Sequence, residues 1–130
     1  MLKKTKILLI DDDEEFARLV KAILNDHVYE VKTATTSEDG LATAGRWQPD
    51  LIALDISMPH LDGIDLLVSL QRDDETKRIP VMMVTAMNNP VSAQMAFHYG
   101  AGSYLTKPIR PEGFLAEISH LVAPKRAKAS

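Results

Sequence analysis

The sequence predicts an α/β domain in which a parallel β-sheet is covered by helices on both faces. Short strand-like runs alternate with segments of helical periodicity in strict strand-then-helix order along the chain. Three of these runs are continuously apolar, as expected of parallel strands that are buried on both sides. The length of 130 residues fits one domain.

The first half of the chain contains two strand-helix pairs. Residues 6–10 form an apolar strand, and residues 29–33 alternate in polarity, which predicts a half-covered strand at an edge of the sheet. Thr35 with Glu38 indicates a capping box that opens a helix running to about Trp47. The helix between the two strands has apolar residues at i, i+3, i+4, i+7 and i+8, namely Phe16, Leu19, Val20, Ile23 and Leu24.

The third pair begins after the helix-breaking Pro49. Residues 51–54 form a buried strand, and Asp62 can cap the helix that follows. The side of that helix that faces inward is expected to carry Ile64, Leu67 and Val68, with Leu70 adjacent.

The fourth pair has clear signals for the start and the end of its helix. Residues 81–84 form a buried strand, and Asn89 is followed by Pro90, which predicts an N-cap with proline at the first helical position. Gly100 marks the end of that helix.

The fifth pair combines a strand at 103–106 with a helix that opens at Pro111. We predict the domain to span residues 1–123, and residues 124–130 to form a flexible basic tail or the start of a linker. The last helix has one apolar face: Phe114, Leu115, Ile118, Leu121 and Val122.

Composition excludes several classes of function. The absence of cysteine rules out disulfides, thiolate metal sites and a cysteine nucleophile. A net charge of −3 gives no general attraction to nucleic acid or anionic lipid. The apolar run near the N-terminus is too short for a signal peptide or a membrane span. We therefore expect a cytoplasmic protein that binds neither membrane nor nucleic acid directly.

Polar residues directly follow four of the five predicted strands. Asp11, Asp12 and Asp13 follow the first strand, and Asp55 follows the third. Thr85 and Lys107 follow the fourth and the fifth. Right-handed crossovers place the carboxyl ends of parallel strands at one edge of a sheet, which is where such sheets carry their sites. The sequence therefore predicts a site at this edge.

The charges at this edge suit phosphoryl transfer. Asp11, Asp12 and Asp55 bring three negative charges together, and each like pair at 4 Å costs roughly 4 kcal/mol at an effective dielectric constant near 20. Lys107 offsets one charge and a divalent cation would offset the other two, with carboxylate and carbonyl oxygens favouring Mg²⁺. A carboxylate can then act as the nucleophile toward phosphorus, forming an aspartyl phosphate.

The sequence resembles the receiver domain of bacterial two-component response regulators from Ile7 to about Val122. This resemblance implies a flavodoxin-like fold, a doubly wound five-stranded parallel sheet of order 2-1-3-4-5 flanked by five helices. It is carried by the acidic pair after the first strand, the run from Pro49 to Pro59 with Asp62-Gly63, Val84-Thr85-Ala86, Gly100-Ala101, and Tyr104-Leu105-Thr106-Lys107-Pro108.

The resemblance implies a role for each acidic residue at the site. Asp55 would be the phosphoacceptor and, with Asp12, a direct Mg²⁺ ligand. Asp11 would hold the metal through water, and the backbone carbonyl of Ser57 would be a further ligand. Ser57 and Met87 lie where the family tunes the lifetime of the phosphoryl group.

The resemblance also implies the roles of the other strand-end residues. Lys107 would contact the phosphoryl group, with a cis peptide bond before Pro108. Thr85 would move to hydrogen-bond a phosphoryl oxygen, and Tyr104 would follow it inward as part of the switch. Asp13 is expected to be a helix N-cap and not a metal ligand.

The resemblance places the chain in a phosphorelay. A histidine kinase or a histidine phosphotransfer protein would donate the phosphoryl group, and the domain would catalyse only its own phosphorylation and dephosphorylation. The output contact, with a downstream target or an effector domain, would lie on the fourth helix, fifth strand and fifth helix. A phosphorylation-dependent homodimer would be possible there.

Two alternatives remain open at this stage. An Asp-nucleophile phosphohydrolase could use Asp11 in an Asp-x-Asp pattern with Asp13, although the threonine that usually follows and the cap insertions are absent. A phosphorylation-independent adaptor domain could keep the fold without the chemistry. A nucleotide-binding domain is not supported, because both glycine-rich phosphate-binding motifs are missing.

Overall fold

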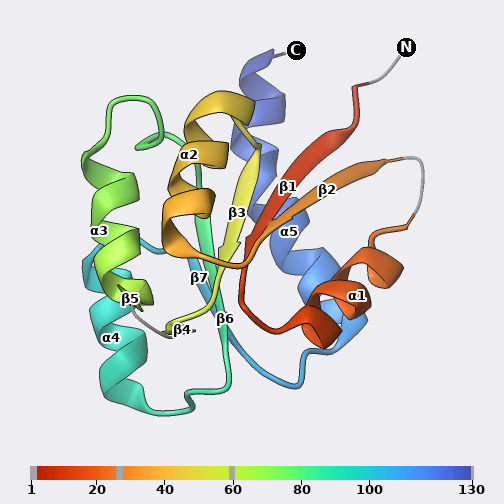
Figure 1. Ribbon diagram of the computed structural model, residues 1–130. Helices are drawn as coiled ribbons and strands as arrows, with labels where there is room; N and C mark the ends of the chain where they lie inside the picture. The colour runs from red at the N-terminus through yellow and green to blue at the C-terminus, as the bar shows by residue number, and fades with distance from the viewer. Residues whose placement is uncertain (1–2, 26–27, 59–60, 130) are drawn as a thin grey trace.

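The computed structural model describes residues 3–25, 28–58 and 61–129 (Figure 1). The main sheet has the order β2-β1-β3-β6-β7, and every neighbouring pair is parallel. This order is the predicted 2-1-3-4-5, with β2 at an edge as expected. The strands are β1 (Thr5–Ile10), β2 (Tyr29–Ala34), β3 (Leu51–Leu54), β6 (Val81–Thr85) and β7 (Ser103–Thr106).

Five helices cover the two faces of the sheet, as the sequence predicts. None of the described helices is both long enough and apolar enough to cross a membrane. The helices are α1 (Glu14–Ile23), α2 (Ser37–Trp47), α3 (Gly63–Arg72), α4 (Pro90–His98) and α5 (Pro111–Ala129).

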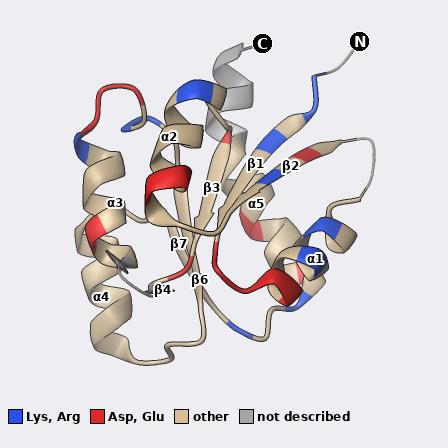
Figure 2. Cartoon of the chain, in the orientation of Figure 1, with Lys and Arg blue, Asp and Glu red and all other residues tan. Residues whose placement is uncertain are grey.

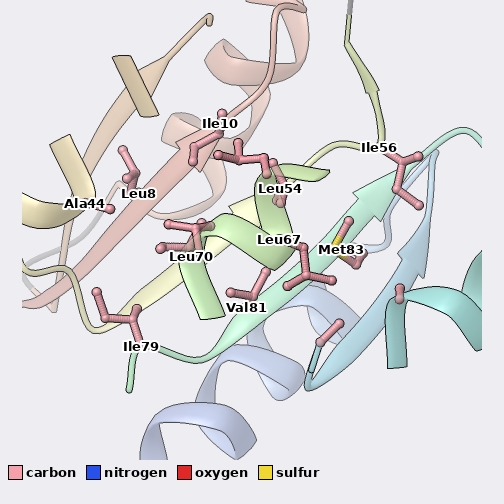
Figure 3. Close-up of a cluster of buried hydrophobic side chains, with 14 of the residues drawn as sticks. Leu8, Ile10, Ala44, Leu54, Ile56, Leu67, Leu70, Ile79, Val81 and Met83 are labelled. Atoms are coloured by element: carbon pink, nitrogen blue, oxygen red, sulfur yellow. The ribbon is translucent and has the colours of Figure 1, made fainter. Parts of the chain in front are cut away.

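The sheet separates two hydrophobic cores because successive side chains of a strand point to opposite faces. On one face, Leu8 and Ile10 of β1 pack with Leu67 and Leu70 of α3 (Figure 3). On the other face, Leu9 packs with side chains of α1 and α5: Phe16, Val20, Phe114, Ile118 and Val122. The central strands β1, β3 and β6 are therefore buried on both sides, which fixes the position of their carboxyl ends.

The helix boundaries confirm most of the predicted caps and helix ends. Asn89 caps α4 by accepting a hydrogen bond from the Ser92 N–H at 2.8 Å, and Pro90 is the first helical residue. Gly100, just beyond the end of α4, has a φ of +107°, a backbone conformation that only glycine adopts readily. The third predicted helix begins at Gly63, but the side chain of its predicted cap, Asp62, lies outside the described part of the structure.

The predicted cap of α2 is wrong by one residue. Thr36, and not Thr35, is the N-cap, and its hydroxyl accepts a hydrogen bond from the Asp39 N–H at 3.1 Å. Thr36 has the extended backbone that an N-cap needs, with φ −127° and ψ 159°. The helix therefore begins at Ser37.

Two further differences concern short and terminal segments. The loop after β3 contains an antiparallel hairpin, β4 (Ser57–Met58) with β5 (Leu61–Asp62), which the sequence analysis did not predict. The backbone of α5 stays helical to Ala129, so the helix continues into residues 124–129, the segment for which we predicted a flexible basic tail or the start of a linker, and that prediction stays a prediction. These residues include lysine, arginine and alanine, which favour helix. The domain boundary at residue 123 remains a prediction.

The close approach of α3 to the end of β3 generates a stability prediction. A Cβ atom on Gly63 would lie 2.4 Å from the backbone oxygen of Asp55 and 2.5 Å from Cα of Ile56. Because backbone cannot give way cheaply, we expect Gly63→Ala to lower the free energy of unfolding by about 1–3 kcal/mol. Urea denaturation followed by circular dichroism measures this change.

Gly45 provides the matched control. It lies inside α2, and an added Cβ would meet nothing within 4 Å. Gly45→Ala should therefore raise the free energy of unfolding by roughly 0.5–1 kcal/mol through helix propensity. If both variants shifted stability in the same direction, the close packing at Gly63 would not be the cause.

Candidate functional site

The carboxyl ends of three strands bring Asp11, Asp55 and Lys107 together. The Lys107 Nζ lies 2.7 Å from Oδ2 of Asp11 and 3.4 Å from Oδ2 of Asp55. Figure 2 shows acidic residues where β1 runs into α1 and where β3 ends. The side chains of Asp11 and Asp55 are buried, so a single ammonium group serves two carboxylates that have little access to solvent.

The backbone holds both aspartates at fixed positions. The Asp11 N–H donates to the carbonyl of Ala34 at 2.9 Å, and the Asp55 N–H donates to the carbonyl of Ile10 at 3.1 Å. The N–H of Lys107 donates in the same way to the carbonyl of Thr85 at 2.8 Å. Each site residue thus continues the hydrogen bonding of the strand before it, which makes the arrangement rigid.

Asp12 completes an acidic cluster with Asp11 and Asp55. One carboxylate oxygen from each residue lies within 4.8 Å of the others, and Asp12 is exposed while the other two are buried. Such a set of oxygen ligands, open to solvent on one side, fits a divalent cation of the Mg²⁺ type, which keeps several of its waters. The charge balance also fits, because one lysine cannot neutralise three carboxylates.

Burial and charge shift the pKa values of the central ion pair. Burial raises the pKa of the Asp11 carboxyl above its ordinary value, and the hydrogen bonds from Lys107 and from the Asp13 N–H only partly offset this. Burial alone would lower the pKa of the Lys107 ammonium, but the hydrogen bond to Asp11 and the charges of Asp11 and Asp55 outweigh it and raise the pKa. Lys107 therefore stays charged at neutral pH.

Asp13 caps α1, as predicted. Its Oδ1 accepts a hydrogen bond from the Phe16 N–H at 3.1 Å, and its own N–H donates to Asp11 at 2.9 Å. Three consecutive aspartates therefore have three different structural positions. Asp11 is buried against Lys107, Asp12 is exposed at the cluster, and Asp13 begins the helix.

Thr85 and Tyr104 meet at the backbone of Met87. The Thr85 side chain is fully buried, and its Oγ accepts a hydrogen bond from the Met87 N–H at 3.2 Å. The Tyr104 hydroxyl donates to the Met87 carbonyl at 2.6 Å. Burial, followed by the negative charge of Asp55, raises the pKa of Tyr104, which keeps its hydroxyl protonated and able to donate.

The remaining predicted residues are placed as follows. The Lys107–Pro108 peptide bond is cis, as the resemblance implied. Ser57 is in the short strand β4, paired with Asp62, just beyond Asp55. Met87, two residues after Thr85, is partly exposed.

Sequence reasoning missed one contributor to the site. The Lys107 Nζ lies 4.1 Å from the centroid of the Phe16 ring, so the ring supports the ammonium group through a cation–π contact. Phe16 was predicted only as part of the apolar face of its helix, and no local pattern links it to a lysine so distant along the chain. The contact arises because the fold brings the first turn of α1 next to Lys107, the residue that follows β7.

Comparison with known proteins gives a consistent result. The family model described as response regulator receiver domain matches residues 7–119. The DNA-binding dual master transcriptional regulator RpaA of Synechocystis sp. is 39% identical over 96% of this chain, which spans 54% of that protein. Protein PilH of Pseudomonas aeruginosa is 35% identical over 91% of this chain, and the match spans 98% of PilH.

The fold has solved relatives as well. A response regulator receiver domain protein (CheY-like) from Methanospirillum hungatei superposes with a TM-score of 0.88 at 27% sequence identity, covering 97% of this chain and 99% of the other. The predicted five-stranded parallel arrangement and its strand order therefore agree with a structure of similar sequence.

The crowding of carboxylates predicts that Asp55→Asn stabilises the metal-free protein. The change removes two repulsions, with Asp11 and Asp12, and one attraction, to Lys107, so we expect the free energy of unfolding to rise by about 1–2 kcal/mol. Millimolar Mg²⁺ should stabilise the parent protein and have a much smaller effect on the variant. Urea denaturation with Mg²⁺ or with a chelator measures both effects.

Asp74→Asn serves as the control for this experiment. Asp74 is exposed and pairs with Lys77 at 2.8 Å on the surface, away from the cluster. Its loss should change the stability by no more than about 0.5 kcal/mol and leave the response to Mg²⁺ intact. A destabilised Asp55→Asn, or one with the full Mg²⁺ response, would contradict the proposed charge balance.

Proposed function

Because this chain belongs to the response regulator receiver domain family, we propose that it accepts a phosphoryl group on Asp55 and thereby changes its affinity for a partner. The phosphoryl group would come from a phosphohistidine of a histidine kinase or a histidine phosphotransfer protein. An Asp55 carboxylate oxygen forms a bond to phosphorus as the phosphorus–nitrogen bond of the donor breaks, and the leaving imidazole keeps the electron pair. Members of this family are typically not enzymes that act on other substrates, and the domain would assist only its own phosphorylation and dephosphorylation.

The observation that carries this proposal is the carboxylate cluster with its single lysine. Asp11, Asp12 and Asp55 supply oxygen atoms within 4.8 Å of one another, and Lys107 reaches Asp55 from the side of Asp11. In the proposal these three carboxylates and the Ser57 carbonyl hold Mg²⁺, which, when bound, neutralises phosphoryl oxygens. Lys107 then exchanges its longer contact with Asp55 for one with the phosphoryl group.

The proposed switch runs through the backbone of Met87. Leu54 pairs with Met83, so Asp55 and Thr85 lie at the ends of adjacent strands. The Thr85 hydroxyl accepts a hydrogen bond from the N–H of Met87, and the carbonyl of Met87 accepts one from Tyr104. When the Thr85 hydroxyl turns to donate to a phosphoryl oxygen, its hydrogen bond with Met87 changes, and the Met87 backbone can move. The state of Asp55 is thereby coupled to the position of the Tyr104 ring.

We assign the output contact to the surface formed by α4, β7 and α5. Large apolar side chains are exposed on α4, with Val91 at 64% and Phe97 at 51% of their full accessibility. Such exposure supports an interaction surface. The Tyr104 ring lies beside it, so a movement of the ring would change the contact available to a downstream target, an effector domain or a second copy. The proposal includes a cytoplasmic location.

The geometry favours Asp55 over Asp11 as the nucleophile. Oδ2 of Asp11 lies 2.7 Å from Lys107, and Oδ1 accepts the Asp13 N–H, so both oxygens of Asp11 are engaged within the protein. The carboxylate of Asp55 has the longer contact with Lys107. The longer contact with Lys107 is the easier one for a phosphoryl group to replace, which supports the receiver proposal over a phosphohydrolase that uses Asp11. A phosphorylation-independent adaptor would need no cluster of this kind.

The proposal predicts Mg²⁺-dependent self-phosphorylation by a small phosphodonor such as acetyl phosphate. The domain itself holds the nucleophile and the groups that bind phosphoryl oxygens, so no kinase is needed for the chemistry. Mass spectrometry of the intact protein and of its peptides should place the adduct on Asp55. Asp55→Asn should lose the adduct, whereas Asp74→Asn should keep it.

The same measurement separates the alternatives. An adduct on Asp11 would move the protein to the phosphohydrolase class. The absence of any adduct, in a protein that still binds Mg²⁺, would support the adaptor alternative.

A further prediction separates phosphorylation from switching. Thr85→Ala should still take up the phosphoryl group, but the resonances of Tyr104 and of α4 should respond weakly because the link through Met87 is lost. Hydrogen bonds to charged groups contribute roughly 1.5–3 kcal/mol each, enough to shift a two-state equilibrium by about tenfold or more. Thr85→Ser keeps the hydroxyl and should restore the response in the NMR spectrum. A full response in Thr85→Ala would contradict the proposed coupling.

A further inference from the structure

A cleft outside the candidate site opens along β2. Figure 1 shows β2 at an edge of the main sheet. We call it the β2 cleft. Helices α1 and α2 form its sides, and β2 crosses it. Its lining includes Lys21 of α1, Val31, Lys32 and Thr33 of β2, and Arg46 and Trp47 at the end of α2.

The cleft is positively charged although the protein as a whole carries a net charge of −3. Lys21, Lys32 and Arg46 are all exposed, and none of the residues that line the cleft is acidic. Figure 2 shows basic residues on β2 and at the end of α2. Glu30, the acidic residue of β2, is not among the residues that line the cleft. The cleft is therefore suited to a negatively charged ligand.

The backbone of β2 presents hydrogen-bonding groups to the cleft. The carbonyl of Val28 accepts from the Thr5 N–H and that of Ala34 from the Asp11 N–H, so the even-numbered residues of β2 point toward β1. Alternate residues of a strand direct their N–H and C=O groups to opposite sides. Val31 and Thr33 therefore direct theirs outward, where no strand of the described chain pairs with β2.

The lysine of this edge strand, Lys32, is directed away from the open edge. A lysine on an edge strand commonly discourages pairing with other chains. The ammonium group of Lys32, however, lies 4.9 Å from the centroid of the Trp47 ring, and that of Lys6 lies 5.0 Å from it. Lys32 is thus directed toward α2, and Trp47 is held as one wall of the cleft.

We propose that the β2 cleft binds an extended acidic segment of a partner protein, which adds to β2 as a new edge strand. The segment would exchange main-chain hydrogen bonds with Val31 and Thr33, while its carboxylates meet Lys21 and Arg46. A small anion would use the cations alone and leave the strand edge unpaired, and a basic segment would be repelled. This binding does not depend on the phosphorylation proposed for Asp55.

The proposal is tested with a blocked peptide that alternates Val and Glu and has the 6-residue length of β2. Titration into the ¹⁵N-labelled protein should shift the amide resonances of Val31 and Thr33 and slow their hydrogen exchange. Two control peptides share its length. One alternates Val and Lys, and the other is the acidic peptide with N-methylated backbone amides. Neither should bind comparably, because the first has the wrong charge and the second lacks main-chain donors.

Variants of the protein test the role of the cations. Lys21→Gln with Arg46→Gln should weaken binding of the acidic peptide by about tenfold, or about threefold for each cation removed. The matched control is Arg72→Gln with Arg78→Gln, which removes the same charge from exposed positions outside the cleft and should leave affinity unchanged. Both double variants keep the residues of the candidate site.

Several results would overturn the proposal. Equal binding of the N-methylated peptide would show that main-chain pairing has no part in the interaction. Equal binding of the Val-Lys peptide, or an equal loss of affinity in both double variants, would show that charge complementarity at the cleft has no part in the binding. Protection of Val31 and Thr33 that rises with protein concentration, without peptide, would assign the edge to a second copy of the chain.

Discussion

The ion pair of Lys107 with Asp11 is the interaction on which the candidate site depends. It joins the ends of β1 and β7, which are not neighbours in the sheet, because β3 and β6 lie between them. Without this cation, the buried carboxylates of Asp11 and Asp55 would face each other, and no other charged residue is buried in the part of the chain that the structure describes. The same ion pair leaves two of the three negative charges in the cluster uncompensated, which fits the proposed divalent ion.

The rigidity of the sheet keeps the charges of the candidate site close together. The central strands are buried on both faces, and Asp11, Asp55 and Lys107 each donate a backbone hydrogen bond to a neighbouring strand. The backbone therefore keeps Asp11 and Asp55 close together despite their repulsion. The hydroxyl groups of Thr85 and Tyr104 each contact the Met87 backbone through one hydrogen bond, and the proposed switch consists of a rearrangement of these two bonds. A fixed acidic cluster beside these two hydrogen bonds suits the proposed phosphorylation switch.

Much of this arrangement could be predicted because parallel topology converts sequence order into spatial position. Asp11, Asp55, Thr85 and Lys107 each end a strand, so the prediction needed only the sheet and not the side-chain packing. The cap of α2 was misplaced because Thr35 with Glu38 and Thr36 with Asp39 fit the same motif, and only the backbone distinguishes them. The β4–β5 hairpin has strands of two residues, too short to show any periodicity. The contact of Phe16 with Lys107 depends on tertiary packing alone.

The hydrogen bond from Tyr104 ends on a main-chain carbonyl, and this has a consequence for how such a domain can diversify. Every residue type offers that acceptor, so mutation at position 87 can change the side chain without deleting the tyrosine's partner. The Met87 side chain is partly exposed and has few packing constraints. Selection could therefore change the side chain at position 87 while the hydrogen bond from Tyr104 to the backbone carbonyl of that residue is kept. The chemistry of the side chain and the hydrogen bond to the backbone can thus evolve independently, although both belong to residue 87.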